Sequence, residues 1–329
     1  MQKDAKIYIA GHRGLVGSAL MRAIARGGYE NVLTRDHASL DLTEQAATRA
    51  FLQAERPDYL FLAAAKVGGI YANDNYPAEF VRQNLAIQDN VIHEAWSSGT
   101  KRLLFLGSSC IYPRLAPQPI KEDSLLTGPL EATNRPYALA KIAGIEMCWS
   151  YNRQYGTQFL AVMPTNAYGP GDNYHAENSH VVPALIRKFH EAKHNGDEEV
   201  SVWGTGRPRR ELLYSDDMAD ACLFLMNLPD GEFKKLLGSD ESRTGKFQPP
   251  LVNIGVGTDL TIRELAELIA EVTGFVGKIT FDSTKPDGTP RKLLDVGRVN
   301  ALGWKASTQL REGLKKTYAD FLRAVEKQV

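Results

Sequence analysis

Residues 6–17 read KIYIAGHRGLVG, and this stretch decides the fold class. A short apolar strand, Lys6 to Ala10, runs directly into a turn with three glycines and then into a helical run, Ser18 to Arg26. A strand, a glycine-rich turn and a helix in this order present free backbone N–H groups and a helix N-terminus to a pyrophosphate. The spacing G-x-x-G-x-x-G differs from the commonest dinucleotide fingerprint, so a purely structural turn is the alternative. Because the turn opens an alternating strand and helix chain, we predict dinucleotide contacts from Gly11, His12, Arg13, Gly14, Leu15, Val16 and Gly17.

The alternation of strands and helices continues to about residue 170. Apolar strands are expected near residues 32–34, 59–63, 102–106 and 158–163, and long helices over 77–98 and 135–155. Strands that are apolar throughout are buried on both faces of a sheet. We therefore predict an α/β fold, in which residues 1–170 form a right-handed, doubly wound parallel Rossmann sheet.

The chain after residue 170 has a different composition and is expected to form a smaller mixed α/β substrate lobe, residues 171–329. We expect helices over 182–194 and 261–273 and at the end of the chain, strands over 200–203 and 278–281, and loops over 204–210 and 285–292. The polar segment 238–250 is rich in residues that interrupt regular structure and is expected to be a flexible insertion. Segments 211–228 and 251–256 are expected to return to the first domain.

Bulk composition excludes several classes of function. The chain has 329 residues, 39 basic and 39 acidic side chains and no basic run, which argues against a nucleic-acid partner. It shows no signal-peptide layout and no apolar run near 18 residues, so we expect a cytoplasmic protein without a membrane partner. The cysteines are odd in number and far apart, which argues against a disulfide framework and a metal cluster; they are Cys110, Cys148 and Cys222.

The end of the second expected strand indicates which dinucleotide binds. A chain that binds NAD usually places a carboxylate here to hold the ribose 2′-hydroxyl, whereas this chain has Arg35. Arg35 and Arg13 together provide two guanidinium groups for a 2′-phosphate, which points to NADP(H). Asp36 next to Arg35 complicates this interpretation, and two solvated arginines are the alternative. Asp41 is a plausible polar contact to the adenine end.

Two further patterns place proton-transfer groups near the sheet. Tyr137 and Lys141 are four residues apart on the expected helix 135–155, so they lie on one face of it. A cation beside a phenol favours the phenolate and would lower the pKa of Tyr137. The alternative is a packed phenol and a solvated lysine. In addition, the strand 102–106 opens onto the sequence GSSCIYP, residues 107–113, whose hydroxyls and thiol are well placed for chemistry.

These motifs in this order resemble the extended short-chain dehydrogenase/reductase family of nucleotide-sugar enzymes, and the resemblance covers nearly the whole chain. More specific stretches resemble members that epimerise GDP-4-keto-6-deoxy-D-mannose at C3 and C5 and then reduce C4 with NADPH; they are residues 10–14, 64–69, 107–113, 164–166, 178–180 and 285–292. The family commonly forms homodimers through the two long helices. The resemblance therefore implies NADP(H), a GDP-sugar substrate and a homodimer.

The resemblance also implies roles for individual residues. Ser108 and Tyr137 would polarise the C4 carbonyl, and Lys141 would hold the nicotinamide ribose. Cys110 as base and His180 as acid would act on opposite faces of the sugar. Further cofactor contacts are implied for Leu106, Gly107, Ser109, Lys141, Pro164, Thr165, Asn166, Ala167 and His180. Substrate contacts are implied for Lys188, Trp203, Arg210 and Asp287.

Three alternatives stay open within this interpretation. A nucleotide-sugar 4-epimerase, or a reductase of another such sugar, would share the fold and the Ser108, Tyr137 and Lys141 set. A 4,6-dehydratase is disfavoured, because dehydratases of this family carry Asp-Glu where this chain has Ser109 and Cys110. The third alternative is a non-catalytic NADP-binding protein.

Overall fold

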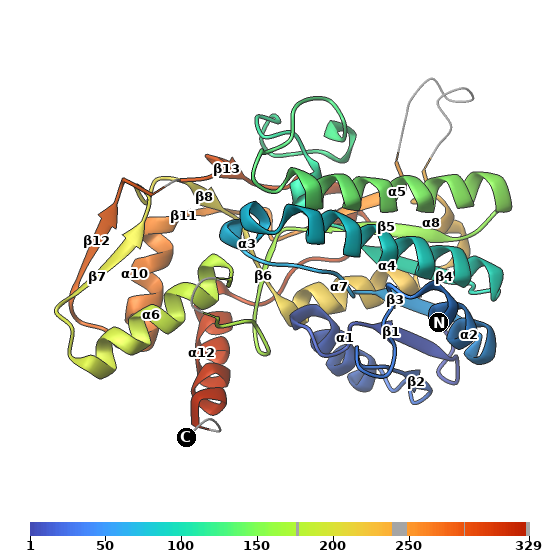
Figure 1. The fold of residues 1–329 in the computed structure, drawn as a ribbon, viewed down its shortest axis with the longest axis horizontal. Coiled ribbons are helices and arrows are strands. Elements are labelled where there is room, and N and C mark those ends of the chain that lie inside the picture. Colours follow the sequence, from blue (N-terminus) through green and yellow to red (C-terminus); the bar gives the residue numbers. More distant parts are fainter. Residues whose placement is uncertain (176–177, 239–248, 286, 327–329) are drawn as a thin grey trace.

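A six-stranded parallel sheet forms the larger part of the protein, as Figure 1 shows. The computed structural model describes residues 1–175, 178–238, 249–285 and 287–326. The order along the sheet is β10-β5-β4-β3-β1-β2, so successive strands are added to one side of β1 and then, from β3 onwards, to the other side. In open sheets of this kind, ligands bind at the carboxyl ends of the strands at this switch point. The strands are β1 (Ile7–Ala10), β2 (Val32–Leu33), β3 (Tyr59–Leu62), β4 (Arg102–Leu106), β5 (Phe159–Pro164) and β10 (Leu251–Ile254).

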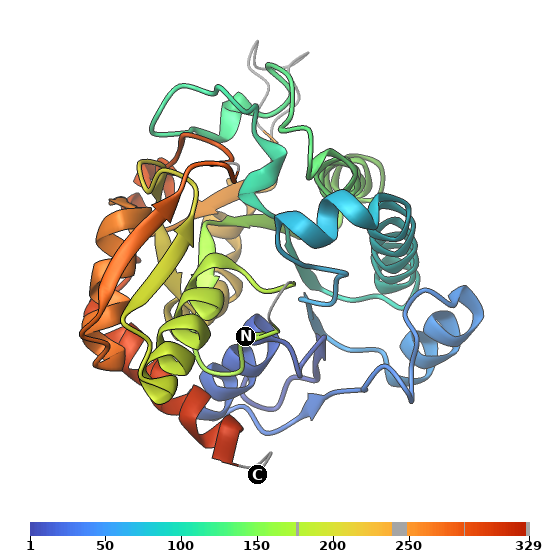
Figure 2. The same cartoon turned by 60° about the vertical axis from the view of Figure 1, so that its left-hand side comes forward.

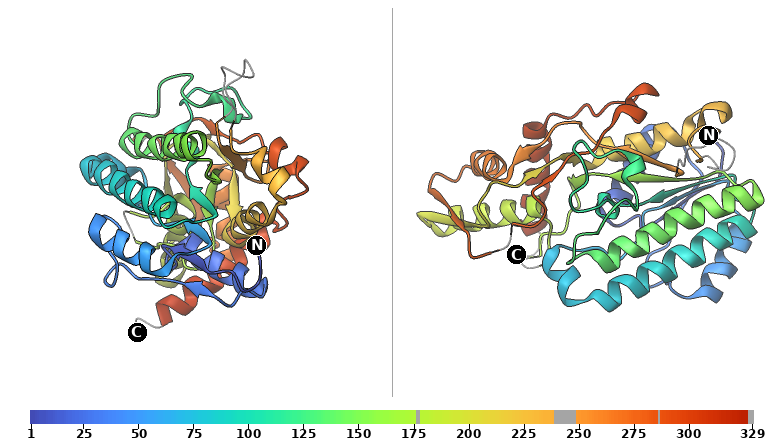
Figure 3. Two further views of the ribbon diagram at one scale, coloured as in Figure 1. Left: turned by 90° about the vertical axis from the view of Figure 1, so that its right-hand side faces the viewer. Right: turned by 90° about the horizontal axis from the view of Figure 1, so that it is seen from above.

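Helices cover both faces of this sheet, which is why its strands are apolar throughout. α1 (Leu15–Arg26) packs against α7 (Ser215–Asn227) on one face. α2 (Gln45–Glu55), α4 (Pro77–Ser97) and α5 (Arg135–Tyr155) cover the other, where α4 and α5 lie side by side (Figure 3). Every residue of β1, β4 and β10 is buried. The predicted doubly wound parallel fold is confirmed.

A second, smaller apolar core lies beyond the carboxyl ends of the strands. β7 (Glu199–Trp203) pairs with β12 (Lys278–Asp282), and α6 (Val181–Asn195) and α10 (Ile262–Thr273) pack beside them, as Figure 2 shows. A capping box, in which Thr261 and Glu264 exchange hydrogen bonds, fixes the start of α10. α12 (Leu310–Glu326) completes this lobe, whose buried core includes Ile186, Phe189, Leu265, Ile269 and Leu314.

Two small sheets connect the lobes. β6 (Asn166–Tyr168) pairs with β9 (Leu212–Tyr214), and β8 (Arg209–Arg210) lies between β11 (Leu260–Thr261) and β13 (Arg291–Lys292). The sequence analysis was wrong to expect only loops over 204–210 and 285–292, since β8 and β13 lie within them. Strands of two polar residues carry no hydrophobic alternation, so only their partners across the sheet reveal them.

The chain crosses between the two cores more than once. β10 extends the main sheet beside β5, and α7 belongs to the same core. Leu294, Val296 and Val299 near α11 (Gly297–Ala301) also pack there. Two further short helices are α3 (Ile70–Asn75) and α8 (Asp230–Lys234). The insertion expected at 238–250 lies mostly outside the described residues. Within the described ranges, none of the helices combines the length and apolar character needed to span a bilayer.

Candidate active site

The glycine turn after β1 forms a cradle that suits a pyrophosphate. Gly11 has φ +86°, and a Cβ there would lie 2.7 Å from the backbone nitrogen of Ala64, at the end of β3. A Cβ on Gly17 would collide with the carbonyl oxygen of Gly11. Gly14 precedes α1 without a side-chain cap, and the first turn of α1 carries no acidic residue. The N-terminus of α1 is therefore open to an anion, so these residues fit a dinucleotide.

The polar residues next to this cradle are already paired. Arg13 Nη2 lies 3.0 Å from Asp36 Oδ2, and Arg35 Nη2 lies 3.0 Å from Glu55 Oε1. Hydrogen bonds from Ser39 lower the pKa of Asp36, and the charge of Arg13 contributes to the same shift. Each arginine thus holds a different carboxylate. Their joint contact to a 2′-phosphate stays a prediction, as does a cofactor contact from Asp36.

Two more residues near the cradle hold local contacts. Asp41 Oδ1 accepts a hydrogen bond from the Thr43 backbone at 2.9 Å, so its side chain stabilises its own loop. His12 Nδ1 is buried and has no hydrogen-bond partner among the residues that the structure describes. A buried nitrogen of this kind is satisfied by a group that binds beside it.

Lys141 and Tyr137 lie on α5 beside the end of β4. Lys141 is 2% exposed, and its Nζ donates a hydrogen bond to the Leu106 carbonyl at 2.8 Å. Nζ also lies 5.8 Å from the centre of the Tyr137 ring. Burial lowers the pKa of Lys141 to about 7. The structure therefore places the two residues on one face, as their spacing predicts.

The predicted effect of Lys141 on Tyr137 is wrong in this structure. Burial raises the pKa of Tyr137 well above its usual value, Cys110 raises it further, and a hydrogen bond with Ser108 lowers it in part. The physical reason is that the same burial that desolvates the phenol also disfavours the charge on Lys141. Tyr137 is accordingly a protonated phenol near neutral pH.

Cys110 lies where two donors converge on its sulfur. It belongs to the short 3-10 helix Ser109–Ile111, and its backbone N–H donates to Ser108 Oγ at 3.3 Å. Sγ accepts from Asn134 Nδ2 at 3.5 Å and from Lys292 Nζ at 3.6 Å. Cys148 and Cys222 are fully buried, and burial raises the pKa of the Cys222 thiol to about 12. Cys110 is therefore the accessible thiol of the three.

His180 precedes α6 and faces the same region from the second lobe. The surrounding protein desolvates the imidazole and lowers its pKa, and the charge of Lys292 lowers the pKa further. The backbone before it is held by the loop after β3, since Gly69 N–H donates to the Asn178 carbonyl at 3.1 Å. A Cβ on Gly69 would lie 2.6 Å from the Ser179 carbonyl oxygen. The glycine thus allows the close approach that places His180.

The predicted substrate contacts lie along the second lobe. Trp203 is 61% exposed, and Lys285 Nζ lies 5.4 Å from its ring centre. Asp287 accepts hydrogen bonds from the backbone and the hydroxyl of Thr205, at 2.7 and 2.9 Å. Lys188 Nζ donates to the Ser201 carbonyl. Desolvation lowers the pKa of Lys188.

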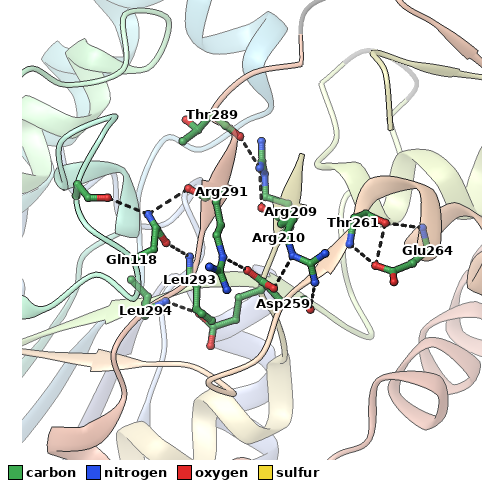
Figure 4. A network of polar contacts seen from close by, with 12 residues as sticks. Gln118, Arg209, Arg210, Asp259, Thr261, Glu264, Thr289, Arg291, Leu293 and Leu294 are labelled. Atoms are coloured by element: carbon green, nitrogen blue, oxygen red, sulfur yellow. Dashed lines mark hydrogen bonds and ion pairs between the residues drawn. The ribbon is translucent and has the colours of Figure 1, made fainter. Parts of the chain in front are cut away.

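Arg210 belongs to a polar network that Figure 4 shows. Its Nη1 donates to the Thr289 carbonyl at 2.6 Å. Desolvation lowers its pKa, and Asp287 counteracts that shift. Beside it, Asp259 accepts from Arg209 Nε at 2.8 Å and from Arg291 Nε at 2.5 Å. The network joins β8, β11 and β13 into one rigid support.

Sequence reasoning missed Glu211, which ties the segment between β8 and β9 to the ends of β5 and β10. Its carboxylate is fully buried and accepts from the backbone N–H groups of Val256, Gly257 and Leu294, at 2.6, 2.7 and 2.9 Å. Its carbonyl accepts from Thr165 Oγ1 and Asn166 Nδ2 at 3.0 and 3.1 Å. Thr165 and Asn166 are thus held at the end of β5, between Pro164 and Ala167. Asn134 and Lys292 were also missed, because the signal for each is its position in space beside Cys110.

A doubly wound sheet with this cradle, and with a Tyr and Lys pair beside the next strand end, defines a dinucleotide-dependent enzyme class. The chain belongs to the NAD dependent epimerase/dehydratase family, whose model matches residues 7–236, and the predicted family is confirmed. It is 56% identical to GDP-L-fucose synthase 1 of Arabidopsis thaliana, over 98% of this chain and 95% of that protein. It is 52% identical to GDP-L-fucose synthase of Escherichia coli (strain K12), over 96% of each.

Solved structures agree with these relatives. A GDP-L-fucose synthetase from Naegleria fowleri bound to NADP superposes with a TM-score of 0.85 at 26% identity. The match covers 99% of this chain and 96% of that chain.

Proposed function

We propose that the protein converts GDP-4-keto-6-deoxy-D-mannose to GDP-L-fucose by 3,5-epimerisation and NADPH-dependent 4-reduction. One observation supports this specific reaction and not merely the family. The donors for a carbonyl oxygen, Ser108 and Tyr137, lie beside a candidate base, Cys110, at the end of β4. Ser108 bonds to Tyr137, and Cys110 is close enough to both to raise the pKa of Tyr137 and to donate its backbone N–H to Ser108. The names of the relatives support the same chemistry.

The epimerisation requires proton transfer at carbons next to a ketone. Such a proton becomes removable when donors stabilise the developing enolate oxygen, and Ser108 and Tyr137 would serve the C4 oxygen in this way. In this proposal Cys110 takes the proton as a thiolate, and His180 returns a proton to the opposite face. General acid and base groups of this kind contribute about 10²–10⁴ in rate.

The reduction uses the same donors on the C4 oxygen. When bound in the glycine cradle, NADPH supplies the hydride to C4. Tyr137 delivers the proton to the oxygen, and its raised pKa keeps the phenol protonated and able to donate. Lys141 is anchored on the Leu106 carbonyl between Tyr137 and the strand end, where it would hold the nicotinamide ribose.

The nucleotide would bind along the second lobe. Exposed Trp203 offers a ring face for stacking, and Arg210 and Lys188 offer positive charge for the diphosphate. Asp287 suits a hydroxyl of the ribose or sugar. We also propose a cytoplasmic homodimer that pairs through α4 and α5, because these helices expose Leu85, Leu139 and Tyr155. Light scattering on the purified protein tests that assembly.

Incubation of GDP-4-keto-6-deoxy-D-mannose with the enzyme in deuterated water tests the function. Deuterium should enter C3 and C5 without NADPH, and GDP-L-fucose should form with it, as proton NMR and NADPH absorbance will show. Reduction without exchange would contradict the roles of Cys110 and His180 and leave a 4-keto reductase. Cofactor binding with neither reaction would indicate the non-catalytic alternative.

A further inference from the structure

The sulfur of Cys110 lies between an amide donor and a cation that come from segments far apart in the sequence. Asn134 stands directly before α5, where a side chain commonly caps the helix, yet its amide makes no cap and instead donates to Sγ at 3.5 Å. Lys292 reaches the same sulfur from β13, with Nζ at 3.6 Å. Two donors, one of them charged, favour a sulfur that carries negative charge.

The backbone around Lys292 is held rigidly. Leu293 N–H donates to Gln118 Oε1 at 2.9 Å, as Figure 4 shows, and the Leu293 carbonyl accepts from Ile120 N–H at 2.8 Å. On the other side, Leu294 N–H donates to the buried carboxylate of Glu211. In the small sheet, Lys292 is the register partner of Arg210. The backbone of Lys292 is therefore fixed in position next to Cys110, unlike that of a solvated surface lysine.

Among the described residues, the neighbouring carboxylate of Asp259 pairs with groups other than Lys292. Asp259 holds both flanking arginines, Arg209 and Arg291, at hydrogen-bond distance. Within the part of the chain that the structure describes, no carboxylate lies at ion-pair distance from Lys292 itself. The positive charge therefore acts on Cys110 and on the imidazole of His180, whose pKa it lowers.

We propose that Lys292 and Asn134 form a thiolate cradle around Cys110, and that Lys292 is the positioning residue that stabilises negative charge on this sulfur during epimerisation. The proposal rests on the proposed role of Cys110 as base. The thiolate takes the proton from C3 or C5 and becomes a thiol, while the electron pair moves onto the C4 oxygen. The imidazolium of His180 gives its proton to the opposite face. Exchange with solvent then returns both groups to their starting forms, and Lys292 itself transfers no proton.

Other charged groups near this sulfur are fixed features of the site. Tyr137 on α5 and Arg210 on β8 interact electrostatically with Cys110. Arg114, Glu131 and Arg291 line the small depression that also contains Cys110, Asn134 and Lys292. Because the substitution K292M leaves all of these in place, it isolates the effect of one charge.

The first test is alkylation of the protein by iodoacetamide at pH 7 without any sugar. Cys148 and Cys222 are fully buried, so native alkylation reports on Cys110, and C110S supplies the background. K292M should slow alkylation about tenfold, because unit charges near 4 Å at a protein surface shift an equilibrium by about that factor or more. K292R should restore part of the rate. K315M removes an exposed lysine on α12 and should change nothing. An alkylation rate of K292M equal to that of the parent protein would overturn the proposal.

The second test separates this proposal from the proposed function. In K292M, both limbs of the pH profile for deuterium exchange at C3 and C5 should move to higher pH. Without the neighbouring cation, the thiol of Cys110 and the imidazolium of His180 should each lose a proton at a higher pH than in the parent. A purely structural role would lower the rate without this shift. Slower alkylation with an unchanged exchange profile would overturn the catalytic assignment of Cys110 while the cradle remains. If K292M does not fold, N134D provides the check, since its carboxylate should slow alkylation with Lys292 intact.

Discussion

Glu211 provides a direct test of how the small sheets are held to the ends of β5 and β10. The substitutions E211A and E211Q remove its contacts in steps. E211A leaves three buried backbone N–H groups without an acceptor, those of Val256, Gly257 and Leu294. Each unsatisfied buried group costs about 1–3 kcal/mol, so E211A should lower the free energy of unfolding by at least about 3 kcal/mol. E211Q keeps one oxygen and turns the other position into a donor that faces an N–H group, which should cost about 1–3 kcal/mol.

The pH dependence of this effect has a defined sign. Burial raises the pKa of Glu211, and its three backbone hydrogen bonds oppose that shift only in part. The folded parent protein therefore binds a proton that the unfolded chain releases near pH 4.5, and the parent loses stability as the pH rises through the raised pKa. Glutamine does not titrate, so the destabilisation by E211Q should shrink over the same interval.

Urea unfolding, followed by fluorescence at several pH values, measures these differences. E264Q is a matched control, because Glu264 is exposed and caps only its own helix. A loss below about 1 kcal/mol for E211A would refute the argument that these three bonds are buried and unreplaced by water. A destabilisation by E211Q that grows with pH would refute the assigned direction of the pKa shift.

Three further predictions follow from the cradle and from α5. G11A should abolish NADPH binding, measured by fluorescence titration, because a Cβ there meets backbone of Ala64. G231A on α8 should bind normally, since it lies outside the cradle and its Cβ would have no atom within 4 Å. Y137F should reduce the rate of 4-reduction by about 10²–10³ with NADPH affinity unchanged, and equal rates would exclude Tyr137 as the proton donor. Since burial lowers the pKa of Lys141 to about 7, the melting temperature of the parent should rise relative to K141M between pH 7 and pH 10, because only the unfolded chain keeps that proton. A constant difference between the two proteins would contradict the burial effect.

The parts of the fold that sequence could predict are those with a strong hydrophobic period. α5 begins at Arg135 and ends at Tyr155, and β4 runs from Arg102 to Leu106, as expected from their apolar patterns. β8 and β13 could not be predicted, because two polar residues form a strand only where partners 50 to 82 residues apart meet them. The glycine turn was predictable for a different reason, since only glycine fits the backbone contacts at Gly11 and Gly17.

The site shows the same division. The spacing of Tyr137 and Lys141 placed both on one helical face, but the pKa of each depends on burial, which local spacing does not reveal. Lys292 meets Cys110 across 182 residues of sequence, so no local pattern could indicate that contact. The roles of the site residues and the boundary at residue 170 remain predictions for the experiments described above.

The two lysines of the site suggest how one pocket could provide both a protonated acid for reduction and an anionic base for epimerisation. Reduction needs a neutral phenol on Tyr137, and the buried Lys141, with a pKa of about 7, exerts only a partial charge on it at neutral pH. Epimerisation needs an anionic sulfur on Cys110, and Lys292 Nζ on β13 lies 3.6 Å from that sulfur. If Lys141 carried a full charge and Lys292 only a partial one, the cation beside Tyr137 would favour the phenolate. Tyr137 would then lack the proton that reduction requires. Because β13 carries Lys292 and α5 carries Lys141, the base for epimerisation and the acid for reduction each have a lysine of their own, and the charge beside one can differ from the charge beside the other.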